Sequence, residues 1–246
     1  MKPSLTNTVA IITGGSKGYG AGIAEHFKQQ GANVWITGRD EKSLTATAHR
    51  LGVHAVVADV TKGSDWDRLF AQVIQATGRV DVLINNAGHA VSIKPLTEQT
   101  DDDIAESIAI NLTGTILGCR RAATVMQQQK SGTIINISSI CAKYAWPGWS
   151  VYSAAKAGVG SVTKCLYTEL RAHGVRVTTL IPSWGATDFA ATPDLAGHPV
   201  RDAAIRAQCT KPVELGEIAA HICTLPPHLE VLEYTVVPMV QEIMPL

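Results

Sequence analysis

Residues 9–20 read VAIITGGSKGYG, a continuous apolar run that breaks into a glycine-rich turn. The apolar run predicts a strand covered on both faces, and a helix-like stretch over 21–30 follows the turn at once. Glycines let a backbone turn tightly and approach a pyrophosphate, whose charge then meets the N-terminus of the next helix. Between a first strand and a first helix, this turn predicts a dinucleotide site; a plain strand–helix connection is the alternative.

The rest of the chain repeats the alternation of strand and helix. Further strands are expected over 33–37, 54–58, 81–85, 133–137, 176–181 and 234–237, and helices over 41–51, 64–77, 102–128, 152–173 and 213–224. This order predicts an α/β fold of the Rossmann type, a three-layer sandwich around a doubly wound, seven-stranded parallel sheet.

No linker or break in composition divides the chain, so residues 1–246 are expected to form a single dinucleotide-binding domain. Within it, residues 183–211 are irregular and rich in proline, glycine and small side chains. An irregular segment of this length inside a compact domain is typical of a binding loop, and we expect it to cover the substrate.

Composition excludes several other classes of protein. The chain has 21 basic and 21 acidic residues, a balance that gives no electrostatic footprint for nucleic acid. Its five cysteines are scattered without a Cys-x-x-Cys pair, which indicates reduced thiols and a cytoplasmic location. We expect no membrane segment, because no apolar stretch is long enough, and no metal site, because the histidines are not paired with other ligand-type residues.

The segment after the second strand bears on the cofactor. An NAD site offers a carboxylate to the ribose 2′-hydroxyl here, whereas an arginine accommodates a 2′-phosphate. Gly38 occupies the carboxylate position, Arg39 follows it, and Lys17 in the glycine turn adds a second cation. Asp40 points away from Arg39 if the segment is extended. The pattern favours NADP(H), with a solvated surface arginine as the alternative reading of Arg39.

Tyr152, Lys156 and Ser139 form a candidate acid–base group. Tyr152 and Lys156 are four positions apart, which places them on one helix face, and Ser139 lies thirteen positions before the tyrosine. A free phenol has a pKa of about 10, and a neighbouring ammonium lowers that pKa by favouring the phenolate. A serine hydroxyl at a strand end can bind the substrate oxygen. We interpret the three as a device for carbonyl chemistry, although such a Tyr–Lys pair also occurs by chance on helix surfaces.

With these residues the chain resembles the short-chain dehydrogenase/reductase family, in its branch of about 250 residues, over essentially its whole length. Supporting motifs are Asp59-Val60 after the third strand, Asn85-Asn86-Ala87-Gly88 after the fourth, and Asn111 in an Asn-Leu-Thr-Gly run. The resemblance implies that Tyr152 is the general acid in reduction and the base in oxidation, and that Lys156 lowers its pKa and binds the nicotinamide ribose. It also implies that Ser139 polarises the substrate carbonyl. Asn111 would bend its helix and keep a water connected to Lys156.

The glycine turn, the second strand and the resemblance together predict the cofactor site. Asp59 and Val60 would flank the adenine, and Thr187 would meet the nicotinamide carboxamide. The full NADP(H) set is Gly14, Ser16, Lys17, Gly18, Tyr19, Gly20, Arg39, Asp59, Val60, Asn86, Ala87, Gly88, Tyr152, Lys156, Pro182 and Thr187.

Two segments depart from the family pattern. After the sixth strand, Pro-Gly-x-x-x-Thr becomes Pro182-Ser183-Trp184-Gly185-Ala186-Thr187, so a less permissive serine replaces the usual glycine. The C-terminal strand, with its Val-Val-Pro run over 236–238, resembles NADP-dependent 3-hydroxy-acid and general carbonyl reductases. The resemblance also implies a homodimer or homotetramer assembled through the helices 102–128 and 152–173.

Aromatic residues near the predicted site suggest a substrate pocket. Trp146, Trp149, Trp184 and Phe189 are candidates for its wall, with packing or a subunit contact as the alternative. No clustered arginines are ready to clamp a carboxylate, so a compact ketone or aldehyde with an apolar side is preferred to a di-acid.

The sequence thus predicts an NADP(H)-dependent oxidoreductase that transfers a hydride between nicotinamide and a carbonyl or secondary alcohol of a small substrate. The alternatives are a catalytically silent dinucleotide-sensing or scaffolding protein, and an epimerase or dehydratase of the same family.

Overall fold

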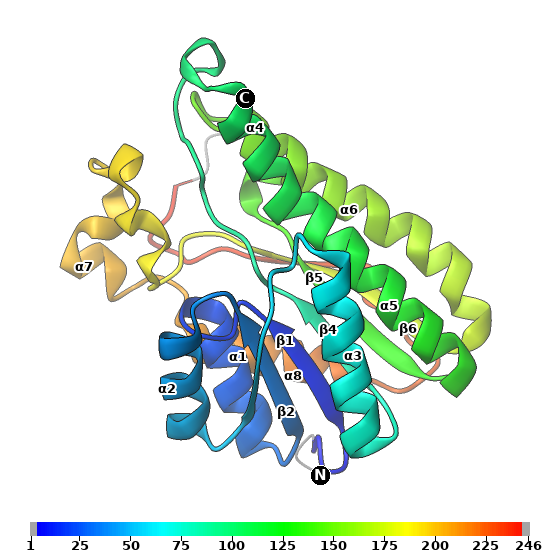
Figure 1. The fold of residues 1–246 in the computed structure, drawn as a ribbon. Coiled ribbons are helices and arrows are strands. Elements are labelled where there is room, and N and C mark those ends of the chain that lie inside the picture. The colour runs from blue at the N-terminus through cyan, green and yellow to red at the C-terminus, as the bar shows by residue number, and fades with distance from the viewer. Residues whose placement is uncertain (1–3, 243–246) are drawn as a thin grey trace.

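A seven-stranded parallel sheet forms the centre of the structure, a computed structural model that describes residues 4–242 (Figure 1). Its strands are β1 (Val9–Thr13), β2 (Asn33–Gly38), β3 (His54–Val57), β4 (Val82–Asn85), β5 (Gly132–Ile137), β6 (Val175–Pro182) and β7 (Glu233–Val236). They lie in the order β3-β2-β1-β4-β5-β6-β7. The predicted sheet is confirmed, and each strand begins and ends within one residue of its predicted bounds.

Helices cover both faces of this sheet (Figure 1). On one face lie α1 (Gly18–Gln29), α2 (Glu41–Leu51) and α8 (Pro212–Cys223), and on the other α3 (Gly63–Thr77), α5 (Gly114–Gln129) and α6 (Ser150–Leu170). Alternate residues of β1 enter the two cores: Ile12 packs with α1 and α8, and Ile11 packs with α3 and α5. Both faces of the strand are therefore buried, which explains its continuous apolar run.

The helix predicted over 102–128 is interrupted in the structure. It divides into α4 (Asp101–Ile108), a π-helical turn (Ala109–Thr113) and α5. Asn111 lies in the π-helical turn, and its Nδ2 donates a hydrogen bond of 3.0 Å to the carbonyl oxygen of Ser107, one turn earlier. A side chain that bonds to the preceding turn competes with the regular backbone ladder, which is a recognised cause of helix distortion.

Residues 183–211 fold into short helices beyond the carboxyl ends of the strands (Figure 1). They include 3-10 turns at Asp188–Ala191, Pro193–Leu195 and Pro199–Arg201, and the helix α7 (Ala203–Arg206). Ala190, Leu195, Val200 and Cys209 form a small buried cluster of their own, so this segment is packed rather than extended. Further 3-10 turns lie at Leu96–Glu98, Ile140–Ala142 and Arg171–His173.

None of the helices found between residues 4 and 242 combines the length and the hydropathy that crossing a membrane requires.

Candidate active site

A cavity of about 890 Å³ opens at the carboxyl edge of the sheet. The ends of β1, β2, β4, β5 and β6 and the segment 183–200 line it, which is where ligands bind in open α/β sheets. The cavity brings together every predicted site residue except Gly20 and Asn111, which lie behind its wall. These lining residues are Gly14, Ser16, Lys17, Gly18, Tyr19, Arg39, Asp59, Val60, Asn86, Ala87, Gly88, Ser139, Trp146, Trp149, Tyr152, Lys156, Pro182, Trp184, Thr187 and Phe189.

The glycine turn has a shape that other residues would not fit. Gly14 and Gly18 adopt φ angles of 64° and 55°, in the left-handed region that side chains disfavour. A Cβ on Gly20 would lie 2.2 Å from the carbonyl oxygen of Gly14 and 2.6 Å from Nδ2 of Asn86. The turn can thus pack closely against the residues that follow β4.

The N-terminus of α1 is left available for an anion. Its N-cap residue, Lys17, makes no side-chain capping bond, and the first turn of the helix carries no acidic residue. Backbone N–H groups at such an end lack intrahelical partners, and they bind phosphate well. The turn and the helix start therefore fit the pyrophosphate of a dinucleotide, in agreement with the sequence pattern.

Hydrogen bonds tie the ends of β1 and β4 together beside this turn. Thr13 Oγ1 accepts bonds from the backbone N–H groups of Asn86 (3.0 Å) and Ala87 (2.9 Å). In return, Nδ2 of Asn86 donates to the carbonyl oxygen of Thr13 at 2.8 Å. Asn86 and Ala87 are thus fixed against the glycine turn.

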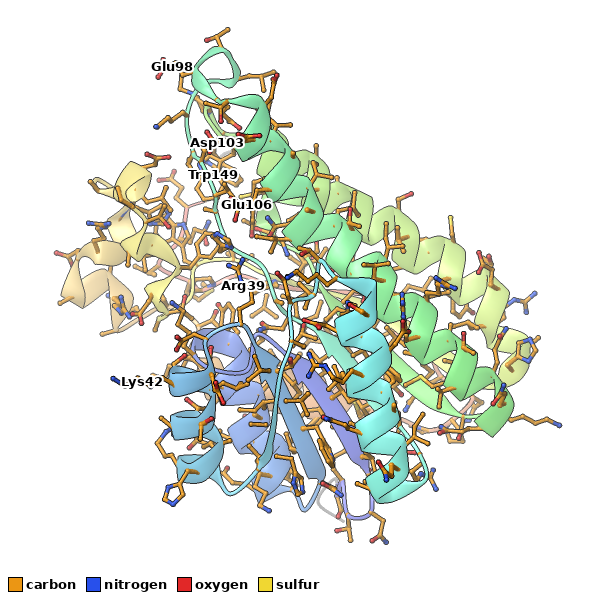
Figure 2. All side chains as sticks on the ribbon, viewed as in Figure 1. Arg39, Lys42, Glu98, Asp103, Glu106 and Trp149 are labelled. Carbon is orange, nitrogen blue, oxygen red and sulfur yellow. The ribbon has the colours of Figure 1, made fainter. Side chains whose placement is uncertain are left out.

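The residues after β2 separate into two directions. Arg39 is exposed and lines the cavity together with Lys17. Asp40 instead caps α2, because its Oδ1 accepts a 2.8 Å bond from the backbone N–H of Ser43. Figure 2 shows Lys42 projecting outward from α2, whereas Arg39 lies above the end of β2. Arg39 is therefore available at the cavity, whereas the carboxylate of Asp40 is used to cap α2.

Tyr152 and Lys156 lie on α6 with their side chains buried, at 7% and 3% exposure. Lys156 Nζ donates to the carbonyl oxygen of Ile137 at 3.0 Å and lies 5.7 Å from the centroid of the Tyr152 ring. Ser138 Oγ donates to the carbonyl oxygen of Lys156 at 2.8 Å, which fixes α6 against the end of β5. Ser139 lies two residues beyond that strand end and lines the same cavity.

Burial controls the ionisation of this group. It raises the pKa of Tyr152 above its ordinary value, with a smaller contribution from Cys141, while the Ser139 hydroxyl acts in the opposite direction. Burial also lowers the pKa of Lys156 to about 8. The net shift of the Tyr152 pKa is therefore upward, because desolvation of the phenolate outweighs the Ser139 hydrogen bond that lowers it. The lowering by Lys156 that the resemblance implies stays a prediction.

Asn111 lies behind Lys156 and is fully buried. Its Nδ2 donates to the carbonyl oxygens of His89 (2.9 Å) and Ser107 (3.0 Å), but its Oδ1 has no hydrogen-bond partner. A Cβ on Gly88 would lie 2.7 Å from this Oδ1 and 3.1 Å from Lys156 Nζ. The unpaired Oδ1 of Asn111 and the Nζ of Lys156 therefore both lie next to the space beside Gly88.

Aromatic rings surround Tyr152 on the substrate side. Trp149 lies 5.5 Å from the Tyr152 ring and Phe189 lies 5.8 Å from it, between centroids. Trp149 and Phe189 face each other at 6.4 Å with 16° between their planes. Trp184 contacts the His198 ring at 5.4 Å. Trp149 and Trp184 thus serve both as part of the cavity wall and as packing residues, because they line the cavity and also belong to the cluster of the 183–211 segment.

The sequence did not point to His198, Val200 and Gln241, which also line the cavity. Gln241 holds the Pro182–Thr187 turn, since its Oε1 accepts bonds from the hydroxyl of Ser183 and from the backbone N–H of Trp184 (3.1 Å). The departure at Ser183 is explained by this contact. No local pattern marks these residues, because they reach the cavity from an irregular segment and from beyond the last strand.

In the described range 4–242, no group of three or more His, Cys, Asp or Glu side chains is placed to hold a metal ion.

Comparison with known proteins gives a consistent picture. A sequence model described as short chain dehydrogenase matches residues 8–195. An uncharacterised oxidoreductase of Staphylococcus aureus is 33% identical over 238 residues, which cover 96% of this chain and 99% of the relative. Among solved structures, the closed form of a serine dehydrogenase complexed with NADP+ superposes with a TM-score of 0.89 at 27% identity, covering 97% of this chain and 98% of its own. A 3-ketoacyl-(acyl-carrier-protein) reductase from Brucella melitensis complexed with NADH gives a TM-score of 0.83 at 29% identity, covering 94% and 97%.

Proposed function

The chain belongs to the short-chain dehydrogenase family, and we propose that it is an NADP(H)-dependent oxidoreductase that acts on a carbonyl or secondary alcohol of a small substrate. The observation that carries the proposal is the joint placement of Ser139, Tyr152 and Lys156 at one cavity with the glycine turn. A silent scaffold has no need of a buried lysine beside a buried tyrosine, since burying such groups costs stability.

The preference for NADP(H) is supported by the charges after β2. Arg39 and Lys17 line the cavity, whereas Asp40, the nearest carboxylate in sequence, is engaged at the start of α2. A guanidinium binds phosphate with several charge-assisted hydrogen bonds. The NADP+ complex of the serine dehydrogenase agrees with this preference, although the NADH complex of the Brucella reductase shows that the fold serves either cofactor.

The residues divide the work of a carbonyl reduction among them. When bound, the nicotinamide supplies the hydride that reaches the carbonyl carbon. The raised pKa keeps the Tyr152 phenol protonated near neutral pH, so Tyr152 donates a proton to the carbonyl oxygen as the alcohol forms. Ser139 donates a hydrogen bond that orients the same oxygen. In the oxidation direction, Tyr152 accepts the proton instead.

Lys156 and Asn111 would replace the proton that Tyr152 gives up. The unpaired Oδ1 of Asn111 and the Nζ of Lys156 face the same space beside Gly88, where a water can accept a bond from one and donate to the other. Such a water would link the acid–base group to solvent.

Oligomerisation through α5 and α6 belongs to the same proposal. Ile116 on α5 is 40% exposed, which leaves an apolar side chain for a subunit contact. Sedimentation of the purified protein would distinguish a homodimer or homotetramer from a monomer.

The Tyr152→Phe variant tests the proposed function. Without the hydroxyl, we expect the turnover number to fall by about 1000-fold, because general acid catalysis contributes on this order. The dissociation constant for NADPH, measured by protein fluorescence, should change by less than about fivefold, since truncating one hydroxyl rarely costs more than ~1 kcal/mol of binding. Undiminished turnover in the variant would refute the assignment.

A further inference from the structure

We propose that the substrate is an uncharged ketone or aldehyde with an aromatic or similarly bulky apolar group beside its carbonyl, and that the site rejects carboxylates. The inference rests on the proposed function and names the substrate class of the same site.

The surroundings of Tyr152 require an apolar group next to the reacting carbonyl. A carbonyl oxygen that accepts the phenol proton must lie within hydrogen-bond reach of Tyr152. The rings of Trp149 and Phe189 lie only 5.5 Å and 5.8 Å from the Tyr152 ring, between centroids, so the carbonyl substituent meets these rings. Rings at such distances gain from contact with a further aromatic or apolar group.

The 183–211 segment extends this apolar wall. Ala190 and Val200 line the cavity and are buried at 5% and 3% exposure, and Trp184 joins the same cluster. Their surface has no charged group to offer a substrate, so it favours apolar atoms over hydrated ones.

The arginines of this segment are not available to a carboxylate. Arg201 donates from Nε to the carbonyl oxygen of Ala190 (2.8 Å) and from Nη2 to that of Thr192 (2.9 Å). Arg206 pairs with Asp188 at 3.1 Å. Neither arginine is among the residues that line the cavity. Both hold the segment together, so neither of these two guanidinium groups is available to clamp a substrate acid.

Other charged groups at the cavity also disfavour an anion. Within residues 4–242, the lysines and arginines that line it are Lys17, Arg39 and Lys156. The first two follow β1 and β2, on the side assigned to the cofactor, and Lys156 donates to the carbonyl oxygen of Ile137. The acidic side chains of Asp188 and Glu242 line the cavity as well.

The two histidines at the cavity do not restore a positive charge. Burial lowers the pKa of His89 and of His198 below the ordinary value, so both imidazoles are neutral at pH 7. A carboxylate beside Trp149 and Phe189 would therefore be desolvated without an ionic partner, which is strongly unfavourable. This conclusion separates the chain from the 3-hydroxy-acid reductases that its C-terminal strand resembles.

Four keto compounds test both parts of the proposal: pyruvate, ethyl pyruvate, benzoylformate and ethyl benzoylformate. In each reduction a hydride from NADPH forms the C–H bond, a proton from Tyr152 forms the O–H bond, and NADP+ and the hydroxy compound are released. We expect kcat/KM to be roughly 100-fold higher for each ester than for its acid, because the acid leaves a charge unpaired. The phenyl compound of each pair should exceed the methyl compound by roughly tenfold.

Preference for the acid in either pair, or equal kcat/KM for phenyl and methyl esters, would overturn the substrate class. Binding of NADPH is followed separately by fluorescence. Turnover of none of the four compounds while NADPH binds would contradict the substrate class alone, whereas failure to bind NADPH would overturn the proposed function with it.

A matched pair of variants isolates the aromatic wall. Phe189→Ala removes a ring that lines the cavity, and Leu195→Ala removes a side chain of the same cluster that does not line it. We expect Phe189→Ala to lower kcat/KM more for ethyl benzoylformate than for ethyl pyruvate, while Leu195→Ala affects both esters equally. An equal loss on both esters in Phe189→Ala would show that the ring acts only through packing.

Discussion

Replacing Lys156 by methionine should change how the free energy of unfolding of the ligand-free protein depends on pH. Lys156 is 3% exposed, and burial lowers its pKa from 10.5 to about 8. Between these two values the unfolded chain binds a proton that the native protein has released, so the lysine makes stability rise with pH. Above pH 10.5 the lysine is neutral in both states and does not destabilise the native protein. As the pH falls through about 8 that stability is lost, because the native protein must then hold a buried charge.

The size of the effect follows from the two pKa values. The full shift corresponds to roughly 3 kcal/mol, and the part that falls between pH 7 and pH 9 is about 1 kcal/mol. Methionine keeps the length of the side chain without its charge, so the Lys156→Met variant should be more stable than the wild type at pH 7. That advantage should shrink by about 1 kcal/mol at pH 9.

Urea denaturation followed by circular dichroism at pH 7 and pH 9 measures this difference. The thiols of Cys119 and Cys223, whose pKa values desolvation raises to about 12, also make stability depend on pH. The cysteines affect the wild type and the variant equally. The difference between their free energies of unfolding therefore reports on the lysine alone. Lys164→Met, at an exposed position of α6, serves as the control, with no change in the difference expected. An equal advantage at both pH values would refute the claim that burial lowers the pKa of Lys156.

Two further substitutions test the cofactor site. Arg39→Ala should weaken NADPH binding by roughly 10- to 100-fold and leave NADH binding unchanged, because a charge-assisted phosphate contact is lost. Equal losses in titrations with both cofactors would contradict the NADP(H) preference. Arg50→Ala, at an exposed position of α2, is the control. Gly20→Ala should destabilise the protein by about 2 kcal/mol and abolish NADPH binding in calorimetry, since its Cβ would lie 2.2 Å from the carbonyl oxygen of Gly14. Gly197→Ala, whose Cβ would meet nothing within 4 Å, should change neither the stability nor the binding of NADPH.

The sheet and the cofactor edge could be predicted from sequence because their physics is local. A strand such as β1, buried on both faces, must be apolar throughout, and the turn after it must contain glycine where φ is positive or the backbone approaches closely. The spacing of Tyr152, Lys156 and Ser139 marked a candidate acid–base group, and the structure brings the three residues to one cavity. The capping role of Asp40 was also within reach, since Asp40 directly precedes the helix predicted over 41–51 and aspartate is a favoured N-cap residue.

The remaining features depend on contacts that the sequence does not display. The resemblance implied that Asn111 bends its helix, but hydrophobic periodicity does not reveal the π-helical turn or its bond to Ser107. The upward shift of the Tyr152 pKa follows from its burial, which the spacing to Lys156 in the sequence does not reveal. Arg201 donates to the carbonyl oxygens of Ala190 and Thr192 only because the 183–211 segment folds back on itself, and the sequence does not show this.

Hydride transfer itself is the most direct test of the proposed function. NADPH deuterated at the transferable position of its nicotinamide ring is incubated with the enzyme and ethyl benzoylformate, and the product is examined by mass spectrometry and NMR. We predict one deuterium on the carbinol carbon for each NADPH consumed, and no labelled product from Tyr152→Phe within the same time. An alcohol without deuterium, or conversion of the substrate without consumption of NADPH, would contradict the account.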